Sequence, residues 1–333
     1  MSPPTKRHVR RPAASPNVQL ADGLRKLGKS ENEIVALLHP KPSPWHGNIS
    51  IGFPGFELWI DDFDGPTSRH LHAAVYGALH QYQQARKDYE HDVRQQLGMF
   101  RRYRTAQAVL AEISASRSRS VVIMPYRDDD QNADAGATHV THMQDVVPLG
   151  MTVLDSDGVV MTMRGKTLTG TGTGADVTVD YTPSMWGPKS KIKGPASAAD
   201  EVLLHELIHV SRQVKGVSRR REVDSGYDNE EEFIAIMIDN IYLSEKGRTQ
   251  LRGTHQANAK GNHDTLVYPE GFLDNKQGLS VLPPYRIIEF LRFRQPALYA
   301  ALAAIQKGNG PGHANFNPIR DWEQRRKDVL IDL

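Results

Sequence analysis

The chain has 333 residues, 39% of them hydrophobic and 24% charged, which is enough for a folded protein with one large domain or two ordinary ones. Its 41 Lys and Arg nearly balance its 39 Asp and Glu, so the net charge of +2 does not indicate nucleic acid as a partner. Cysteine is absent, which excludes disulfides and any metal site built on thiolates.

The first 45 residues predict a mostly disordered, basic tail. Its Pro-rich segments, MSPPTKRHVRRPAASP and HPKPSPW, are poor candidates for a packed core. Residues 1–30 contain many Lys and Arg but one acidic residue, Asp22. This composition indicates either a solvated tail or a delivery signal that contacts an anionic surface. Only a short amphipathic stretch at residues 31–38 interrupts this tail.

Residues 46–118 predict a helical N-terminal region. Apolar residues recur at a spacing of three to four positions from Leu71 to Tyr82, from Tyr89 to Phe100 and from Ala106 to Ile113. This period is typical of helices that bury one face, so we expect two or three helices here.

Residues 119–333 predict an α+β domain. Val121–Met124 is a short apolar run typical of a buried strand, and Met151–Leu154 with Val159–Met163 predicts a hairpin. Val177–Tyr181 alternates apolar and polar residues, as does either a plain sheet strand or an edge strand that pairs with an extended substrate. Helices are expected again from Ile287 to Ile305.

The most specific motif is His205-Glu206-Leu207-Ile208-His209, in an apolar helix that Ser197 can cap. Residues four apart in a helix lie on one face, so both imidazoles can bind one Zn²⁺, while Glu206 can take a proton from water. The simpler interpretation is a set of ordinary helix residues. However, polar groups in so apolar a helix are costly to bury without partners, and a metal ion provides them.

A catalytic zinc ion needs a third protein ligand. The metzincin motif would place Gly at position 212 and His at position 215, but this chain has Arg212 and Lys215. The alternative is a Glu from a second helix, and the helical run that starts after Asn229 begins with Glu230, Glu231 and Glu232. The residues themselves do not decide which of these three carboxylates is the third ligand.

The segment Asn229–Ala235, NEEEFIA, resembles the N-E-x-E-F-x-A stretch of the anthrax lethal factor catalytic domain. In that pattern the Glu before Phe binds zinc, which implies Glu232 as the third ligand, with Glu231 and Glu230 as rivals. Tyr227 lies near the position of a tyrosine in lethal factor, which implies that it donates a hydrogen bond to the oxyanion.

Three further polar residues are weaker candidates for supporting roles. His255 and His263 are alternative donors to the oxyanion, although both are expected to be surface histidines. Asp239 is a candidate to orient one of the zinc-binding histidines.

The wider layout is similar to that of the NleD-like family of zinc metallopeptidase effectors, which bacteria inject into host cells. The shared order is a helical lead, a strand at residues 121–123, a G-T-G segment, a strand at residues 177–181 and the sequence L-x-H-E-L-I-H. The resemblance covers roughly residues 105–260. It implies a zincin-like metallopeptidase domain, one catalytic Zn²⁺ and a protein or peptide substrate.

The expected function is therefore a zinc-dependent endopeptidase in which Glu206 is the general base, within a bacterial effector or toxin. No apolar run reaches the roughly 18 residues of a membrane span, and no signal peptide is recognised, so we expect synthesis in the cytoplasm and delivery by a specialised secretion system. The alternatives are an inactive zincin-fold binding module and an adaptor whose basic tail contacts an anionic surface. The intact Glu206 argues against the first, and the near-neutral remainder of the chain argues against the second.

Overall fold

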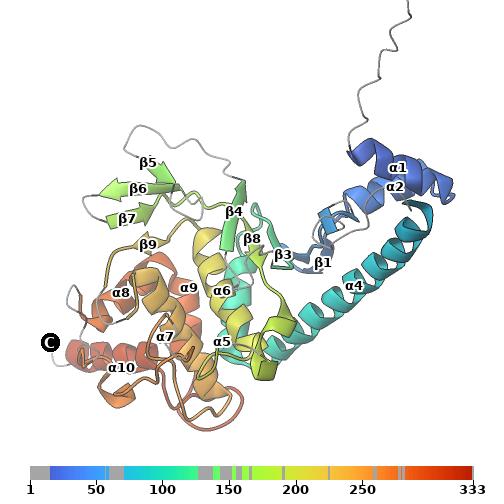
Figure 1. Ribbon diagram of the computed structural model, residues 1–333. Coiled ribbons are helices and arrows are strands. Elements are labelled where there is room, and N and C mark those ends of the chain that lie inside the picture. Colours follow the sequence, from blue (N-terminus) through green and yellow to red (C-terminus); the bar gives the residue numbers. More distant parts are fainter. Residues whose placement is uncertain are drawn as a thin grey trace, which may run out of the picture. The chain divides into compact units, whose positions relative to one another are not determined.

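The computed structural model describes residues 16–56, 58–59, 71–126, 138–142, 152–154, 160–164, 167–189, 192–223, 226–256, 258, 261–276, 279 and 282–331. The chain divides into two compact units (Figure 1): Met1–Lys41 with Phe53–Asp88, and Pro42–Gly52 with Tyr89–Leu333. The domain boundaries expected at residues 45 and 118 remain predictions. Among the described helices, none combines the length and apolarity that crossing a membrane requires.

The first unit contains α1 (Pro16–Lys26), α2 (Glu31–Leu38) and the beginning of α4 (Leu71–Met99). Ser30 caps α2, because its hydroxyl accepts from the backbone N–H of Glu33 at 3.4 Å while the Glu33 carboxylate accepts from the backbone N–H of Ser30 at 2.9 Å. The amphipathic stretch at residues 31–38 is therefore helical, and the expected disordered tail contains two helices from Pro16 onward. Residues 1–15 lie outside the described part.

The second unit contains a five-stranded mixed sheet in the order β1-β2-β3-β8-β4. These strands are β1 (Ser43–His46), β2 (Ile49–Ile51), β3 (Val121–Met124), β8 (Asp176–Asp180) and β4 (Thr138–His142). The pairs β2–β3 and β3–β8 are parallel, whereas β1–β2 and β8–β4 are antiparallel. Since β8 lies between β3 and β4, the predicted strand at Val177–Tyr181 is a plain sheet strand and not an edge strand.

A second sheet has the order β5-β6-β7-β9 and is antiparallel throughout. Its strands are β5 (Thr152–Leu154), β6 (Val160–Arg164), β7 (Thr167–Gly170) and β9 (Arg219–Arg220). The pairing of β5 with β6 is the hairpin that the sequence predicts, although its turn lies outside the described residues.

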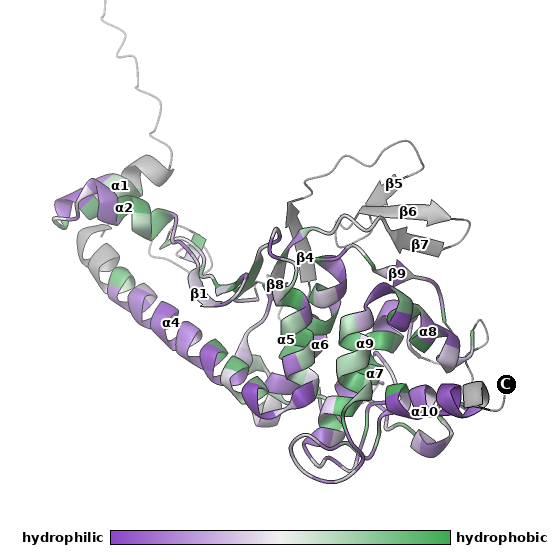
Figure 2. Ribbon diagram, turned by 180° about the vertical axis from the view of Figure 1, so that it is seen from behind, coloured by the Kyte–Doolittle hydropathy of each residue, from purple (hydrophilic) through white to green (hydrophobic). Residues whose placement is uncertain are grey.

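The second unit also contains the C-terminal part of α4 and several complete helices. The complete helices are α5 (Arg104–Ser114), α6 (Ala199–Gln213), α7 (Glu230–Glu245), α8 (Pro284–Arg294), α9 (Pro296–Ala303) and α10 (Pro318–Ile331), with short 3₁₀ turns at Phe100–Arg102, Pro183–Met185, Gly187–Lys189 and Pro269–Gly271. Figure 2 shows hydrophobic residues concentrated in α5, α6 and α9, whereas α10 is mostly hydrophilic. The architecture is α+β with a small mixed sheet, as predicted.

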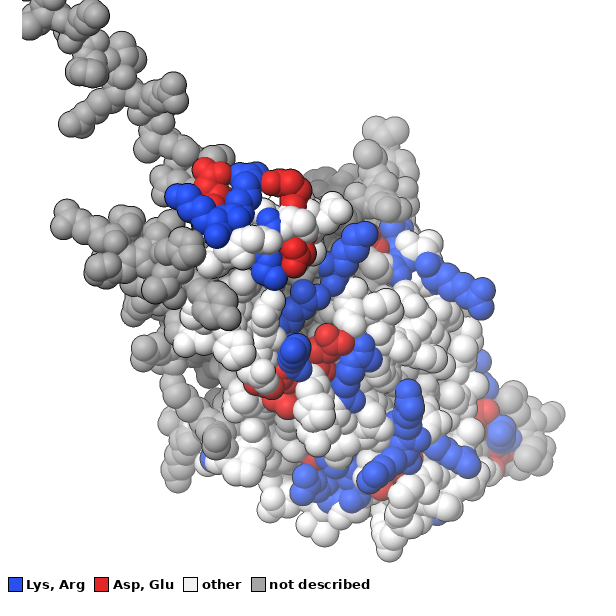
Figure 3. Space-filling view, turned by 90° about the vertical axis from the view of Figure 1, so that its right-hand side faces the viewer, with Lys and Arg blue, Asp and Glu red and all other residues white. Residues whose placement is uncertain are grey.

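Charged side chains of both signs are scattered over the face of the molecule that Figure 3 shows. On the face shown in Figure 3, Lys and Arg lie among Asp and Glu and do not merge into one continuous basic surface in the described part of the chain. This distribution agrees with the near-neutral net charge of +2.

Candidate metal centre

The helix α6 carries the HELIH motif in the interior of the second unit. Ala198, and not the predicted Ser197, is its N-cap residue, and the carboxylate of Glu201 accepts the backbone N–H of Ala198 at 3.1 Å. Acidic side chains at a helix N-terminus interact favourably with the helix dipole. Leu203, Leu204, Leu207 and Ile208 are fully buried, so packing fixes the direction in which the intervening polar residues point.

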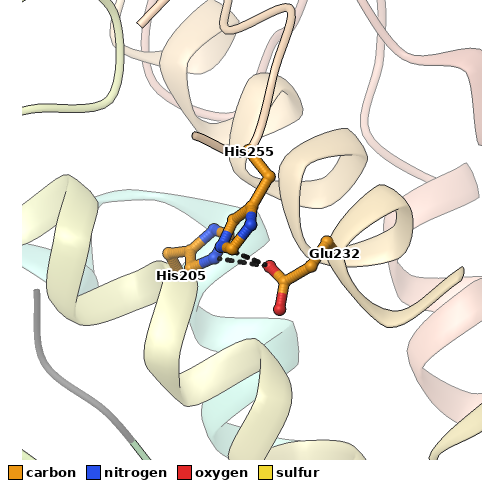
Figure 4. Close-up of side chains that lie close together, drawn as sticks. All are labelled: His205, Glu232 and His255. Atoms are coloured by element: carbon orange, nitrogen blue, oxygen red, sulfur yellow. Dashed lines mark ion pairs between the residues drawn. The ribbon is translucent and has the colours of Figure 1, made fainter. Parts of the chain in front are cut away.

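The two histidines of the motif meet a carboxylate from α7. The Nε2 atoms of His205 and His209 lie 3.3 Å apart, and each lies 3.3 Å from Oε2 of Glu232. The structure therefore brings together three of the predicted site residues in a triangle with equal sides. Figure 4 shows Glu232 approaching His205 from the neighbouring helix.

The geometry of this triangle fits a zinc ion. Zinc binds imidazole nitrogen and carboxylate oxygen at about 2.0–2.1 Å, and a tetrahedral arrangement at that distance separates the ligands by roughly 3.3 Å. Oε2 of Glu232 is buried and has no hydrogen-bond partner in the described structure, although histidine nitrogens lie 3.2–3.3 Å from it. A buried acceptor surrounded by nitrogens that are not aligned as donors is the environment that a cation would satisfy.

The charges of His205 and Glu232 suit a metal ion, whereas His209 would have to lose a proton to bind one. Burial lowers the pKa of His205 to about 3, which keeps this imidazole in the neutral form that binds metal ions. Burial also acts to lower the pKa of His209, but the charge of Glu232 raises it to about 9. Burial alone would raise the pKa of Glu232, and the charge of His209 with the contacts to both histidines holds it well below its ordinary value. Glu232 is therefore ionised.

The three consecutive glutamates of α7 have different environments. Asn229 caps the helix, because its side chain accepts the backbone N–H groups of Glu231 and Glu232 at 2.9 and 3.2 Å. Glu231 accepts two hydrogen bonds from the buried guanidinium of Arg212, and Glu230 faces Arg219 at 3.3 Å. Of the three candidates, Glu232 is the one whose carboxylate lies among the histidines.

Glu206 is buried beside the triangle. The residue is 7% exposed, and its charge helps to raise the pKa of His209 and opposes the lowering of the Arg252 pKa by burial. The guanidinium of Arg252 is also buried, and it places a positive charge near Glu206 and Glu232. This arginine is a residue of the site that the sequence did not indicate, because no periodic pattern connects it to the motif.

Tyr227 and His263 are both buried, but neither has a described contact with the triangle. The Tyr227 ring packs against Phe233 at 5.0 Å, and burial raises its pKa to about 12. Nδ1 of His263 lies 3.1 Å from the carbonyl oxygen of Pro195, and burial lowers its pKa to about 4. The expectation that His263 is a surface histidine is wrong.

Asp239 is fully buried on α7, and both carboxylate oxygens lack a hydrogen-bond partner within the described residues. Burial raises its pKa well above the ordinary value. Nδ1 of His205 also lacks a partner there, and no described hydrogen bond joins the two groups. The predicted orienting contact is therefore not formed in this structure.

His255 is the fourth polar side chain at the site. Its Nε2 lies 3.2 Å from Oε2 of Glu232, and its ring lies parallel to that of His205 with centroids 6.3 Å apart (Figure 4). Donor atoms of His205, Glu232 and His255 lie within 4.8 Å of one another, so two possible sets of three metal ligands share His205 and Glu232. His255 comes from a loop and its side chain is 33% exposed, so it lies partly at the surface, as expected, while its Nε2 atom faces the site.

Most of the region that contains the site matches a known protein family. The family model of peptidase M91, described as effector protein, matches residues 78–260, which is more than half of the chain. Searches of the curated proteins and of the solved structures found no match. The matched residues include α5, α6, the first helical turn of α7 and the loop that carries His255.

Proposed function

Because the chain belongs to the peptidase M91 family of effector proteins, we propose that it is a zinc-dependent endopeptidase of the zincin type, delivered into a target cell to cleave a protein. The observation that supports this most strongly is the triangle formed by His205, His209 and Glu232, with sides of 3.3 Å. Effector metallopeptidase is the function of the family, whereas the metal, the general base and the delivery route are our proposals.

In this proposal His205, His209 and Glu232 hold the zinc ion. When bound, zinc acidifies a water molecule and polarises the scissile carbonyl group. Glu206 takes the proton from the attacking water and delivers it to the leaving amine. Its position in the α6 helix, next to His205, fixes the carboxylate beside the metal ligands. Tyr227 and His255 are the two candidate donors to the oxyanion.

The test compares the wild type with Glu206→Ala, measuring metal content and cleavage of a proteome-derived peptide library. We expect about one zinc ion per chain in both proteins, because the ligands are unchanged. Cleavage should fall about 1,000-fold in the variant, as expected for loss of a general base. A wild-type protein that binds no zinc, or a variant that cleaves as fast as the wild type, would contradict the proposal. Zinc binding by a wild type that cleaves nothing would favour the binding-module alternative.

A further inference from the structure

His255 is accessible where the metal ligands are not. Its side chain is 33% exposed, compared with 15% for Glu232 and 6% for His205. The Nε2 atom nevertheless points at the site, 3.2 Å from Oε2 of Glu232. A substrate that reaches the metal from solvent would therefore meet this imidazole nitrogen.

Asp228 holds the His255 ring from the other side. The Oδ2 atom of Asp228 lies 2.5 Å from Nδ1 of His255 and also accepts from the Gln256 side chain at 3.3 Å. Asp228 has a left-handed backbone conformation, with φ of 58°, which is uncommon outside glycine. Backbone conformations of this kind persist where the surrounding structure imposes them, often at functional sites.

The backbone of the His255 loop is fixed as well. The N–H of His255 donates to the carbonyl oxygen of Gly226 at 2.7 Å. The guanidinium of Arg252 donates to the carbonyl oxygens of Thr254, at 2.8 Å, and of His255. In turn, both backbone groups of Arg252 bond to the side chain of Asn240 on α7 at 2.7 and 2.8 Å. The imidazole is thus positioned by hydrogen bonds to the helix that carries Glu232.

We propose that His255, oriented by Asp228, is a catalytic residue that donates a hydrogen bond from Nε2 to the oxyanion formed during peptide hydrolysis. This inference rests on the proposed function. The equal-sided triangle already supplies three zinc ligands, so His255 is not needed as a ligand. A ring whose Nδ1 donates to the Asp228 carboxylate can also donate from Nε2 only as the imidazolium ion, so this role requires both ring nitrogens of His255 to be protonated. No bond is made or broken at His255, which contributes only the hydrogen bond.

Tyr227 is the less suitable donor. Its side chain is 2% exposed, and its ring packs against Phe233. A donor aimed at the position of the developing charge stabilises the transition state more than the ground state. The partly exposed His255 is open to a substrate carbonyl in this structure, whereas the buried Tyr227 is not.

The experiment uses the zinc-loaded full chain with His255→Ala, Asp228→Asn and Tyr227→Phe, and His91→Ala as an exposed-histidine control. Zinc affinity is measured by competition with a chelating dye. Kinetics are measured on the best-cleaved library peptide, and binding of its phosphinic analogue, a mimic of the tetrahedral intermediate, by calorimetry. Asn tolerates the left-handed backbone of position 228, and His255→Gln replaces the alanine variant if that variant does not fold.

We expect wild-type zinc affinity and KM for His255→Ala, with kcat and analogue affinity both falling about 100-fold. Asp228→Asn should show a smaller loss of the same kind, Tyr227→Phe should lose less kcat than His255→Ala, and the control His91→Ala should match the wild type. Loss of zinc by His255→Ala would make His255 a ligand, and unchanged kcat would remove its role; either result overturns the inference and leaves the proposed function standing. A wild type that binds no zinc or cleaves nothing overturns both.

Discussion

The two compact units are stabilised in different ways. The first has an apolar cluster that includes Leu24, Phe56 and Tyr82, and its charged pairs, such as Arg25 with Glu31, are exposed. The second buries charged side chains between α6 and α7, among them the fully buried Arg212 and Glu230. Apolar burial is favourable by itself, whereas a buried charge is favourable only when it is paired. The buried charges therefore lie in the unit that carries the proposed metal site.

The largest expected effect is on the metal site itself. Glu232→Ala should lower the zinc affinity by at least about 100-fold. Removing a residue that only hydrogen-bonds to a metal ligand already lowers metal affinity by about 10- to 100-fold. Glu230→Ala, which removes a carboxylate of the same helical turn, should keep the wild-type affinity. Dye competition measures both values. The reverse result would make Glu230 the third ligand and break the distinction between structural and metal-binding carboxylates.

The largest effect on stability is expected at the buried ion pair. Arg212→Met should lower the free energy of unfolding by about 3–5 kcal/mol, because it leaves the Glu231 carboxylate buried without its bidentate partner. Arg212→Met combined with Glu231→Leu should recover part of this loss, since two apolar residues replace the pair. Urea unfolding of both variants tests this. Equal stability of Arg212→Met and the wild type would show that the pair contributes nothing.

A smaller effect is expected in the first unit. Phe56→Ala should destabilise this unit by about 3 kcal/mol, because it removes a fully buried aromatic ring. Zinc affinity should not change. Dye competition measures the zinc affinity, and hydrogen exchange of the same sample measures the stability of the first unit. Arg25→Ala is the surface control and should have no measurable effect on unfolding, because exposed ion pairs contribute little. A loss of zinc in Phe56→Ala would show that the units depend on each other.

The sequence predicted the parts of the site that lie on regular helices. His205 and His209 are four residues apart on one helix, so their common face follows from helical geometry alone. The carboxylates of the second helix were also visible, but the residues left three candidates, and packing of α6 against α7 separates Glu232 from Glu231 and Glu230.

The loop residues of the site were not predictable in the same way. Asp228 and His255 are 27 positions apart, and their contact depends on the path of a loop that no periodic pattern describes. The sheet order was likewise not encoded locally, since β4 precedes β8 in the chain but pairs with it as the edge strand. Helix α1 was assigned to a disordered tail because its composition is polar, although packing on Phe56 and Tyr82 supports it. Helix α2 coincides with the amphipathic stretch that was predicted to interrupt this tail.

The most direct test of the zinc site is anomalous diffraction at the zinc edge from crystals of the zinc-loaded protein. One peak is expected about 2.0–2.1 Å from Nε2 of His205, Nε2 of His209 and a carboxylate oxygen of Glu232, with His255 beside the open coordination position. A peak held by His205, Glu232 and His255, with His209 free, would contradict both the ligand set and the role of His255.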